Sequence, residues 1–364
     1  MAEPDQALAA APRDESPDGN GVATDSTPLT DAGRRTPRRL DGSKLTLTAI
    51  RIGPGLMLLA VVIIIASLSP VFLSTRNIGN VLSQSAVIAV LALAQLLVII
   101  TRGIDLSVGS TLALSAVVGA LVFSSVPSGP LVVLAMLATG ALVGAVNGTV
   151  FVWGRLPHPF IVTLATLSVA RGLALWLSGG QPLQGMPEIV RNIGGGSLGW
   201  FPYSGFLVAG LALLALLLTT RLVWGRWIYA VGGNPDGALR AAIPTKRVLI
   251  SVYVLSGLAA GVGAVITSGR LNGGSPTFGE LAELDTIAAV VIGGASFLGG
   301  RGTVANALVG ALMIGVIRNG MNLLNVDAFL QPIVIGVVIV LAVELDVVRG
   351  RFEQRLRVMT AAQA

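Results

Sequence analysis

The stretch LLVIITRGIDLSVGSTLAL, Leu96 to Leu114, joins two apolar runs through a short polar segment that contains one acid. Gly103 and Gly109 bracket this acid, Asp105, and relax the backbone on both sides. A carboxylate at the centre of a bilayer costs about 2.5–3.5 kcal/mol on insertion scales, and less near the interface. The stretch therefore predicts a break between two helices, where Asp105 or Ser107 accepts hydrogen bonds from the first free N–H groups of the second helix.

The composition places these apolar runs in a membrane. Of the 364 residues, 53% are hydrophobic and 12% are charged, and the mean hydropathy is +0.82, whereas a soluble domain carries about 25% charged residues. Eight of the 18 acids lie in the first 44 residues, which leaves ten acids for the other 320. This distribution predicts an all-α polytopic membrane protein.

Several chemistries are excluded by the residues that the chain lacks. There is no cysteine and one histidine, His158, so a disulfide framework is ruled out and a zinc site is disfavoured. The two lysines, Lys44 and Lys246, do not follow a glycine, so the chain has no P-loop with which to hydrolyse ATP. With scattered acids and one histidine, the sequence offers no constellation for an integral membrane enzyme.

The apolar segments predict about ten transmembrane helices, because a helix needs ~20 apolar residues to cross the hydrocarbon core. We expect a disordered cytoplasmic tail at 1–48, a transmembrane domain at 49–348 and a second cytoplasmic tail at 349–364. The eighth segment is short and glycine-rich, which indicates a broken or half helix. The ten predicted spans are 53–69, 78–100, 108–125, 131–152, 160–178, 205–223, 248–268, 284–297, 303–322 and 329–347.

The basic residues predict the orientation of these spans. With the N-terminus in the cytoplasm, 19 of the 24 basic residues fall on the inside and three on the outside, as the positive-inside rule requires. A basic pI therefore reflects membrane orientation rather than nucleic-acid binding. The same count places both termini in the cytoplasm.

Two glycine-rich breaks and a few polar residues are the candidates for a translocation pathway. The break at Asp105 has a weak counterpart at VVIGGASFLGGRGTVANALVGAL, Val290 to Leu312, which hints at an internal repeat of the kind that transporters use. Polar side chains within a span must face a partner or a water-filled cavity. Each residue taken singly could instead make an interhelical hydrogen bond, and Asp105 could be a simple cap. The candidate pathway and hairpin residues are Asp105, Ser107, Gly109, Asn147, Arg171 and Asn319.

Small residues also recur at helical spacing. Gly140, Gly144 and Gly148 form one stripe, and Gly257 and Gly261 form another. Such stripes let helices approach closely in lipid, so packing is their expected role.

The predicted cytoplasmic loop at 224–247 carries a short helix of its own. Asn234 is its expected N-cap, Pro235 lies in the first turn, and Pro244 stops it. A short helix that two membrane spans hold in the cytoplasm is a docking element, although a solvated connector is the alternative.

From about residue 70 onward, the chain resembles the permease subunits of ribose-type ABC importers. GIDLSVGS is the most specific string, and LPHPFIVTLATLSVARGLAL is similar to a second family segment, which places Thr163 and Arg171 on it. GRWIYAVGGNPDGALRAAI resembles the family's cytoplasmic loop that leads into the coupling helix. ELDTIAAVVIGGASFLGGRGTV resembles its last signature.

The chain departs from the family pattern in three places. In the coupling segment Gly237, Ala241 and Ala242 differ, with Ala242 in the place of a glycine. Ala305 and Asn306 stand where the family commonly has a bulky residue and glycine. The outer loop GGGSLGWFPYS is not the usual short sequence, so the binding protein that faces it is expected to be unusual.

The resemblance implies a type II-like ABC importer permease that carries a sugar or sugar-like neutral solute by alternating access. It implies a homodimer of permeases, a separate ABC ATPase that uses ATP and magnesium, and an extracytoplasmic solute-binding protein, in the cytoplasmic membrane of a bacterium. The chain itself binds no cofactor and no nucleic acid. A branched-chain amino-acid or nucleoside permease, or a stand-alone secondary transporter, is the alternative. The implied ATPase-coupling residues are Gly225, Arg226, Gly232, Gly233, Asn234, Asp236, Ala238, Arg240 and Ile243.

Overall fold

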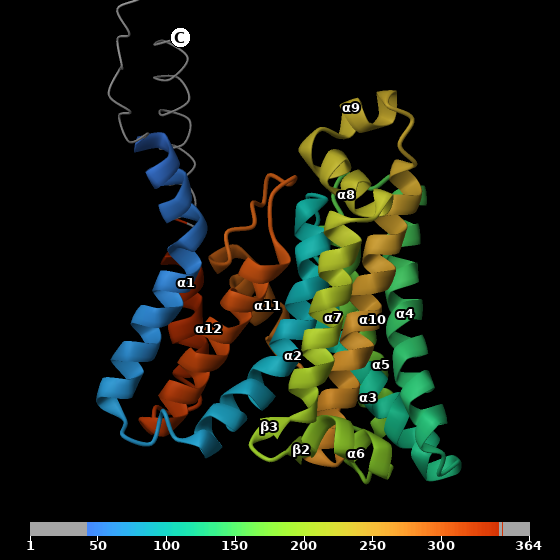
Figure 1. Cartoon of the computed structure of the whole chain (residues 1–364). Coiled ribbons are helices and arrows are strands. Elements are labelled where there is room, and N and C mark those ends of the chain that lie inside the picture. The colour runs from blue at the N-terminus through green and yellow to red at the C-terminus, as the bar shows by residue number, and fades with distance from the viewer. Residues whose placement is uncertain (1–41, 342–343, 345–364) are drawn as a thin grey trace, which may run out of the picture. The chain divides into compact units, whose positions relative to one another are not determined.

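The computed structural model describes residues 42–341 and residue 344, and these form a bundle of helices (Figure 1). Both predicted tails lie largely outside the described residues, although α1 begins at Gly42, inside the segment that we assigned to the first tail. The helices are α1 (Gly42–Leu68), α2 (Thr75–Ile100), α3 (Val108–Ser125), α4 (Gly129–Trp153), α5 (Phe160–Ser178), α6 (Glu188–Gly195), α7 (Tyr203–Thr220), α8 (Val223–Gly233), α9 (Pro235–Arg240), α10 (Thr245–Leu271), α11 (Ala282–Ile292) and α12 (Val304–Leu323).

The prediction of an all-α polytopic protein is confirmed. Seven of the described helices are long and apolar enough to cross a membrane, namely α2, α3, α4, α5, α7, α10 and α12. Shorter apolar helices occupy Gly53–Leu68 and Gln331–Leu341. The eighth predicted span is the 11-residue helix α11, which agrees with the expected half helix. A helix therefore lies at each of the ten predicted segments, but the number of ten full crossings stays a prediction.

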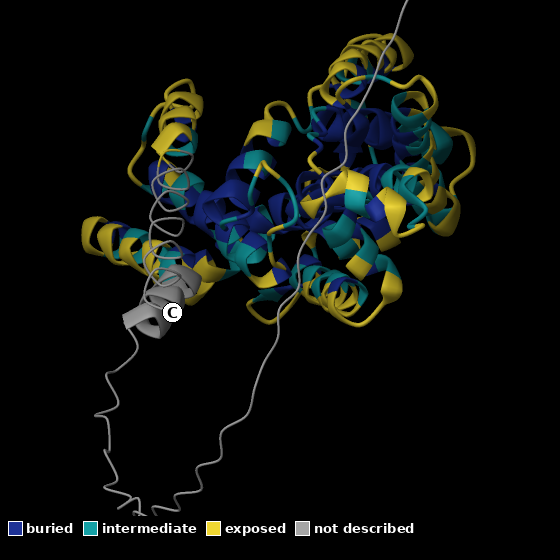
Figure 2. Ribbon diagram, turned by 90° about the horizontal axis from the view of Figure 1, so that it is seen from above, coloured by how far each residue is buried: buried dark blue, intermediate teal, exposed yellow. Residues whose placement is uncertain are grey.

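The centre of the bundle is α2, whose most apolar stretch is 83% buried. It packs against α10, α12, α11 and α7, and nearly every residue from Ile88 to Ile100 is buried because neighbours surround the helix. Buried residues lie on the helix faces turned toward other helices, and exposed ones lie on the outward faces (Figure 2). Exposed leucines on α4, α5 and α7 are expected where hydrocarbon, not water, is the solvent.

The glycine stripes pack α4 against α10, as predicted. A Cβ atom added to Gly140 would collide with the carbonyl of Gly257, and one added to Gly144 would collide with the carbonyl of Tyr253. The two backbones therefore touch directly, which side chains would prevent.

The segment between α5 and α7, expected to be an outer loop, is more ordered than the sequence indicates. It holds α6, the strand β1 (Leu183–Gln184) and the hairpin of β2 (Ser197–Leu198) with β3 (Phe201–Pro202). β1 pairs in antiparallel fashion with β4 (Gly273–Gly274), which directly follows α10. This pairing ties the end of α10 to the segment after α5.

Candidate functional site

The break between α2 and α3 is a non-helical segment, Gly103–Ser107, in which Gly103, Asp105 and Ser107 are buried. Asp105 is 1% exposed. Its Oδ1 accepts hydrogen bonds from the Ser107 backbone N–H at 2.9 Å and from the Ser107 hydroxyl at 2.6 Å. Its Oδ2 accepts a bond from the Ser256 hydroxyl of α10 at 2.7 Å. The Ser107 side chain, at the N-cap of α3, makes no capping hydrogen bond, whereas Asp105 accepts a hydrogen bond from the backbone N–H of this N-cap residue, as one of the two predicted arrangements requires.

The network continues into two more helices. Asn147 of α4 donates through Nδ2 to the Ser107 hydroxyl at 2.9 Å, and its Oδ1 accepts a bond from Thr166 of α5 at 2.6 Å. Thr163 of α5 donates to the carbonyl of Ile104 at 3.1 Å. Three of the predicted pathway residues, Asp105, Ser107 and Asn147, therefore share one hydrogen-bond network that joins α4, α5 and α10 to the break.

A second non-helical segment, 275–281, meets this break; it lies between two predicted spans, but we named none of its residues as candidates for the pathway. A Cβ atom on Gly109, at the start of α3, would collide with the carbonyl of Gly279 and lie 2.5 Å from Oε2 of Glu283. Arg171 of α5 holds the same segment, because its guanidinium donates to the carbonyls of Pro276 and Phe278. The run GGSPTFGE, 273–280, with its glycines and a proline, is the signal that could have indicated a break.

Asn319 is not part of the hydrogen-bond network around Asp105. Its side-chain amide and that of Asn77 bond each other reciprocally, at 2.9 and 3.0 Å, which joins α12 to the first turn of α2. Beside it, Arg318 forms an ion pair with Asp285 of α11 at 2.6 Å. This geometry favours the alternative that we left open for Asn319, an interhelical hydrogen bond.

The predicted cytoplasmic helix is present as α9. Oδ1 of Asn234 accepts a hydrogen bond from the Gly237 N–H at 2.9 Å, so the N-cap is confirmed. Ala238 is buried and Ile243 is half-buried, whereas Asp236 and Arg240 are exposed. Leu239, also on α9, is 66% exposed. The helix thus presents an apolar residue between two charges of opposite sign.

The helix α8, which precedes α9, was not predicted as a separate element. It allows close contacts at two glycines. A side chain on Gly225 would collide with the backbone of α7 at Leu218 and Thr219, and one on Gly232 would collide with the carbonyl of Ile100. Of the other predicted residues, Arg226 and Gly233 are exposed.

Four hydrogen bonds link the end of α8 and the two glycine-rich hairpins to one another, and we name them the latch. Arg102, just after α2, donates through Nε to the carbonyl of Gly232 at 2.5 Å and through Nη2 to that of Gly233 at 2.8 Å. The Gly300 N–H donates to the carbonyl of Ile100 at 2.8 Å. The Tyr229 hydroxyl donates to the carbonyl of Gly302 at 2.8 Å, and burial raises the pKa of this phenol, so it stays protonated.

The latch satisfies carbonyls that a helix end leaves without partners. A cation at a helix C-terminus is also favoured by the helix dipole. Arg102 caps α8 in this way, while its own backbone is in the left-handed region, with φ of 64°.

Non-helical backbone at membrane depth is tolerated where it is buried in protein or lines a cavity, and a multi-pass bundle with buried breaks is an arrangement that membrane transporters use. The family model described as "Branched-chain amino acid transport system / permease component" matches residues 77–343. The chain belongs to this permease family.

Named relatives cover most of the chain. It is 41% identical to the ribose import permease protein RbsC of Bacillus subtilis over 301 residues, which is 81% of this chain and 92% of that protein. It is 40% identical to RbsC of Escherichia coli K12, over 79% of this chain and 91% of the relative. It is 37% identical to the D-allose transport system permease protein AlsC of the same strain, over 81% and 90%. No solved structure matches.

Proposed function

We propose that this chain is the membrane-spanning subunit of an ATP-driven importer, which carries a sugar or sugar-like neutral solute into a bacterial cytoplasm by alternating access. A separate ABC ATPase hydrolyses ATP. The observation that carries the proposal is α9, a short capped helix that leaves Leu239, Asp236 and Arg240 free to contact a partner. The sugar specificity is supported by the relatives, whose names are those of ribose and D-allose permeases.

The latch is the proposed route by which movement of the ATPase reaches the translocation pathway. A movement of α9 is passed to α8 through the shared residue Asn234. From the end of α8 it reaches Arg102, which directly precedes the segment 103–107 that contains Asp105. Through Tyr229 it also reaches the hairpin at Gly302. One conformational change of the ATPase would thereby move both glycine-rich hairpins together.

The proposed pathway runs past the segment 275–281. Glu280 is exposed, and Glu283 is half-buried near Gly109. Charged side chains at membrane depth face a bundle interior or a water-filled cavity rather than lipid. Carboxylates and the Arg171 guanidinium supply acceptors and donors for hydroxyl groups, which suits a neutral polyhydroxylated solute.

In the assembly that we propose, two copies of the permease form one pathway and both termini lie in the cytoplasm. The extracytoplasmic binding protein then faces α6 and the β2–β3 hairpin, at the end of the bundle opposite α8 and α9 (Figure 1). Exposed apolar groups there, Ile189, Leu198 and Trp200, are available to such a partner.

A branched-chain amino acid is the second candidate solute, because the description of the matching family names it. A ligand screen on the binding protein separates the two: we expect pentoses or hexoses to stabilise it, and stabilisation by leucine or valine would contradict the sugar assignment. A stand-alone secondary transporter would take up solute without ATP or an ATPase.

The coupling role is tested by reconstituting the permease with its ATPase and binding protein in vesicles. Replacing Pro235–Arg240 by a Gly/Ser linker should abolish uptake. Arg102→Gln should leave ATP hydrolysis but lower the solute carried per ATP by tenfold or more, because it removes two bonds from a charged donor, worth about 1.5–3 kcal/mol each. Arg221→Gln, an exposed arginine outside the latch, is the control. Normal uptake with the linker would refute the docking role of α9, whereas normal coupling in Arg102→Gln would refute the latch alone.

A further inference from the structure

A groove runs along one face of α10, lined by α7 and α8 near one end and by α2, α4 and α7 beside it. It consists of two cavities. The one near α8 has a volume of about 470 Å³ and the one beside it about 270 Å³, and Leu218 and Leu255 line both. The second cavity is lined entirely by apolar residues of α2, α4, α7 and α10. The two cavities are thus adjacent along α10, and we refer to them together as the groove.

The length of the groove suits a hydrocarbon chain. Its lining on α10 extends from Arg247 to Val262, a rise of about 22 Å at 1.5 Å per residue. One leaflet of a bilayer contributes about 15 Å of hydrocarbon. The groove is therefore long enough to hold the whole of an acyl chain that enters at Arg247.

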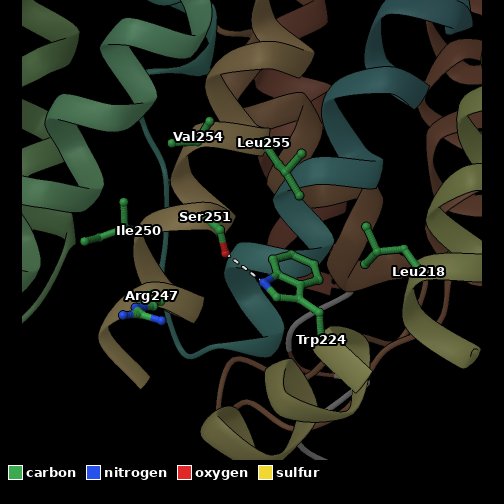
Figure 3. Close-up of a pocket in the computed structure, with 7 residues that line it drawn as sticks. All are labelled: Leu218, Trp224, Arg247, Ile250, Ser251, Val254 and Leu255. Carbon is green, nitrogen blue, oxygen red and sulfur yellow. Dashed lines mark hydrogen bonds between the residues drawn. The ribbon is translucent and has the colours of Figure 1, made fainter. Parts of the chain in front are cut away.

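The polar end of the groove contains Trp224, Ser251 and an arginine, Arg247, whose guanidinium has no partner among the described residues. The Trp224 indole N–H donates to the Ser251 hydroxyl at 2.9 Å (Figure 3). This hydroxyl donates in turn to the carbonyl of Val248 at 2.8 Å. Arg247 lines the same end, is exposed, and has no hydrogen-bond or ion-pair partner among the described residues. A cation and an indole at one end of an apolar groove match an anionic headgroup at the membrane interface.

We propose that this groove binds an anionic phospholipid, with an acyl chain along α10 and α7 and the headgroup phosphate on Arg247. The apolar lining selects a chain, and Arg247, the one charged residue in the lining of the two cavities, selects the charge. The site lies next to the latch, because Trp224 belongs to α8. The inference does not depend on the transported solute or on the ATPase.

The test is quenching of Trp224 by brominated lipids in the purified full-length protein, reconstituted in phosphatidylcholine vesicles. The Trp224 signal is the difference between the parent and Trp224→Phe. Brominated phosphatidylglycerol should quench this signal at about one fifth of the mole fraction that brominated phosphatidylcholine requires, from about 1 kcal/mol per basic residue near a membrane surface. Arg247→Gln should remove the preference while quenching by both lipids remains.

Lys246→Gln is the matched control, because Lys246 is the neighbouring cation and does not line the groove. It should leave the preference unchanged. Equal quenching of the parent by both lipids would overturn the headgroup assignment, and so would a loss of preference in Lys246→Gln. Absence of quenching by either lipid would overturn the lipid site and indicate that another protein surface, such as a second copy, covers the groove.

Discussion

Replacing Asp105 by alanine should destabilise the protein far more than replacing it by asparagine. Asp105 accepts three hydrogen bonds, from the backbone N–H and the hydroxyl of Ser107 and from the hydroxyl of Ser256. Each buried donor left without a partner costs about 1–3 kcal/mol. We expect Asp105→Ala to cost about 3–5 kcal/mol, because the hydroxyls can turn to other acceptors but the N–H cannot.

Asparagine retains an oxygen in the place of Oδ1 and so keeps both bonds to Ser107. Its NH₂ group would then face the Ser256 hydroxyl, which can rotate and accept the bond. The expected cost is about 1 kcal/mol. Since domains are stable by about 5–15 kcal/mol, the alanine variant should lose a large part of its folded population and the asparagine variant should not.

The assay is the free energy of unfolding of purified variants in mixed micelles, followed by tryptophan fluorescence. Ser256→Ala and the double variant Asp105→Ala/Ser256→Ala complete a cycle in which we expect a coupling energy of about 1 kcal/mol or more, since the residues are in contact. If asparagine destabilises as much as alanine, or if alanine costs less than about 1 kcal/mol, the argument that these three bonds hold the break is wrong.

Two further predictions concern glycine. Ala242 is in the left-handed region with φ of 56°, so Ala242→Gly should stabilise the protein by about 1 kcal/mol and Ala242→Val should destabilise it. The same unfolding assay measures both changes, and an equal effect of the two variants would contradict this reading. Gly257→Leu should push α10 away from the Gly140 backbone and lower the free energy of unfolding by about 1–3 kcal/mol or more. Gly210→Leu is the control: an added Cβ at this position of α7 meets nothing within 4 Å, so the free energy of unfolding should change by less than about 0.5 kcal/mol.

The positions of the helices could be predicted from the sequence because each depends on local properties. The predicted spans 108–125 and 160–178 have the bounds of α3 and α5, since the charged or turn-forming residues that end them are neighbours in the chain. The Asn234 cap was predictable for the same reason, because its partner Gly237 is three residues away. The charge at Asp105 predicted a break in the helix, since a carboxylate among apolar residues requires hydrogen-bond partners or a polar cavity.

The partners of these residues depended on the tertiary structure. Asp105 meets Ser256, 151 residues away, and Arg102 meets Gly232, 130 residues away. Which donor reaches a carboxylate is decided by how α2, α4, α5 and α10 pack, and hydropathy carries no information about that packing. The sequence by itself therefore determined that the chain crosses a membrane and where its helices break. Only the packing of the helices decided that the break is held by neutral donors and that Arg102, at the end of the break, is bound to α8.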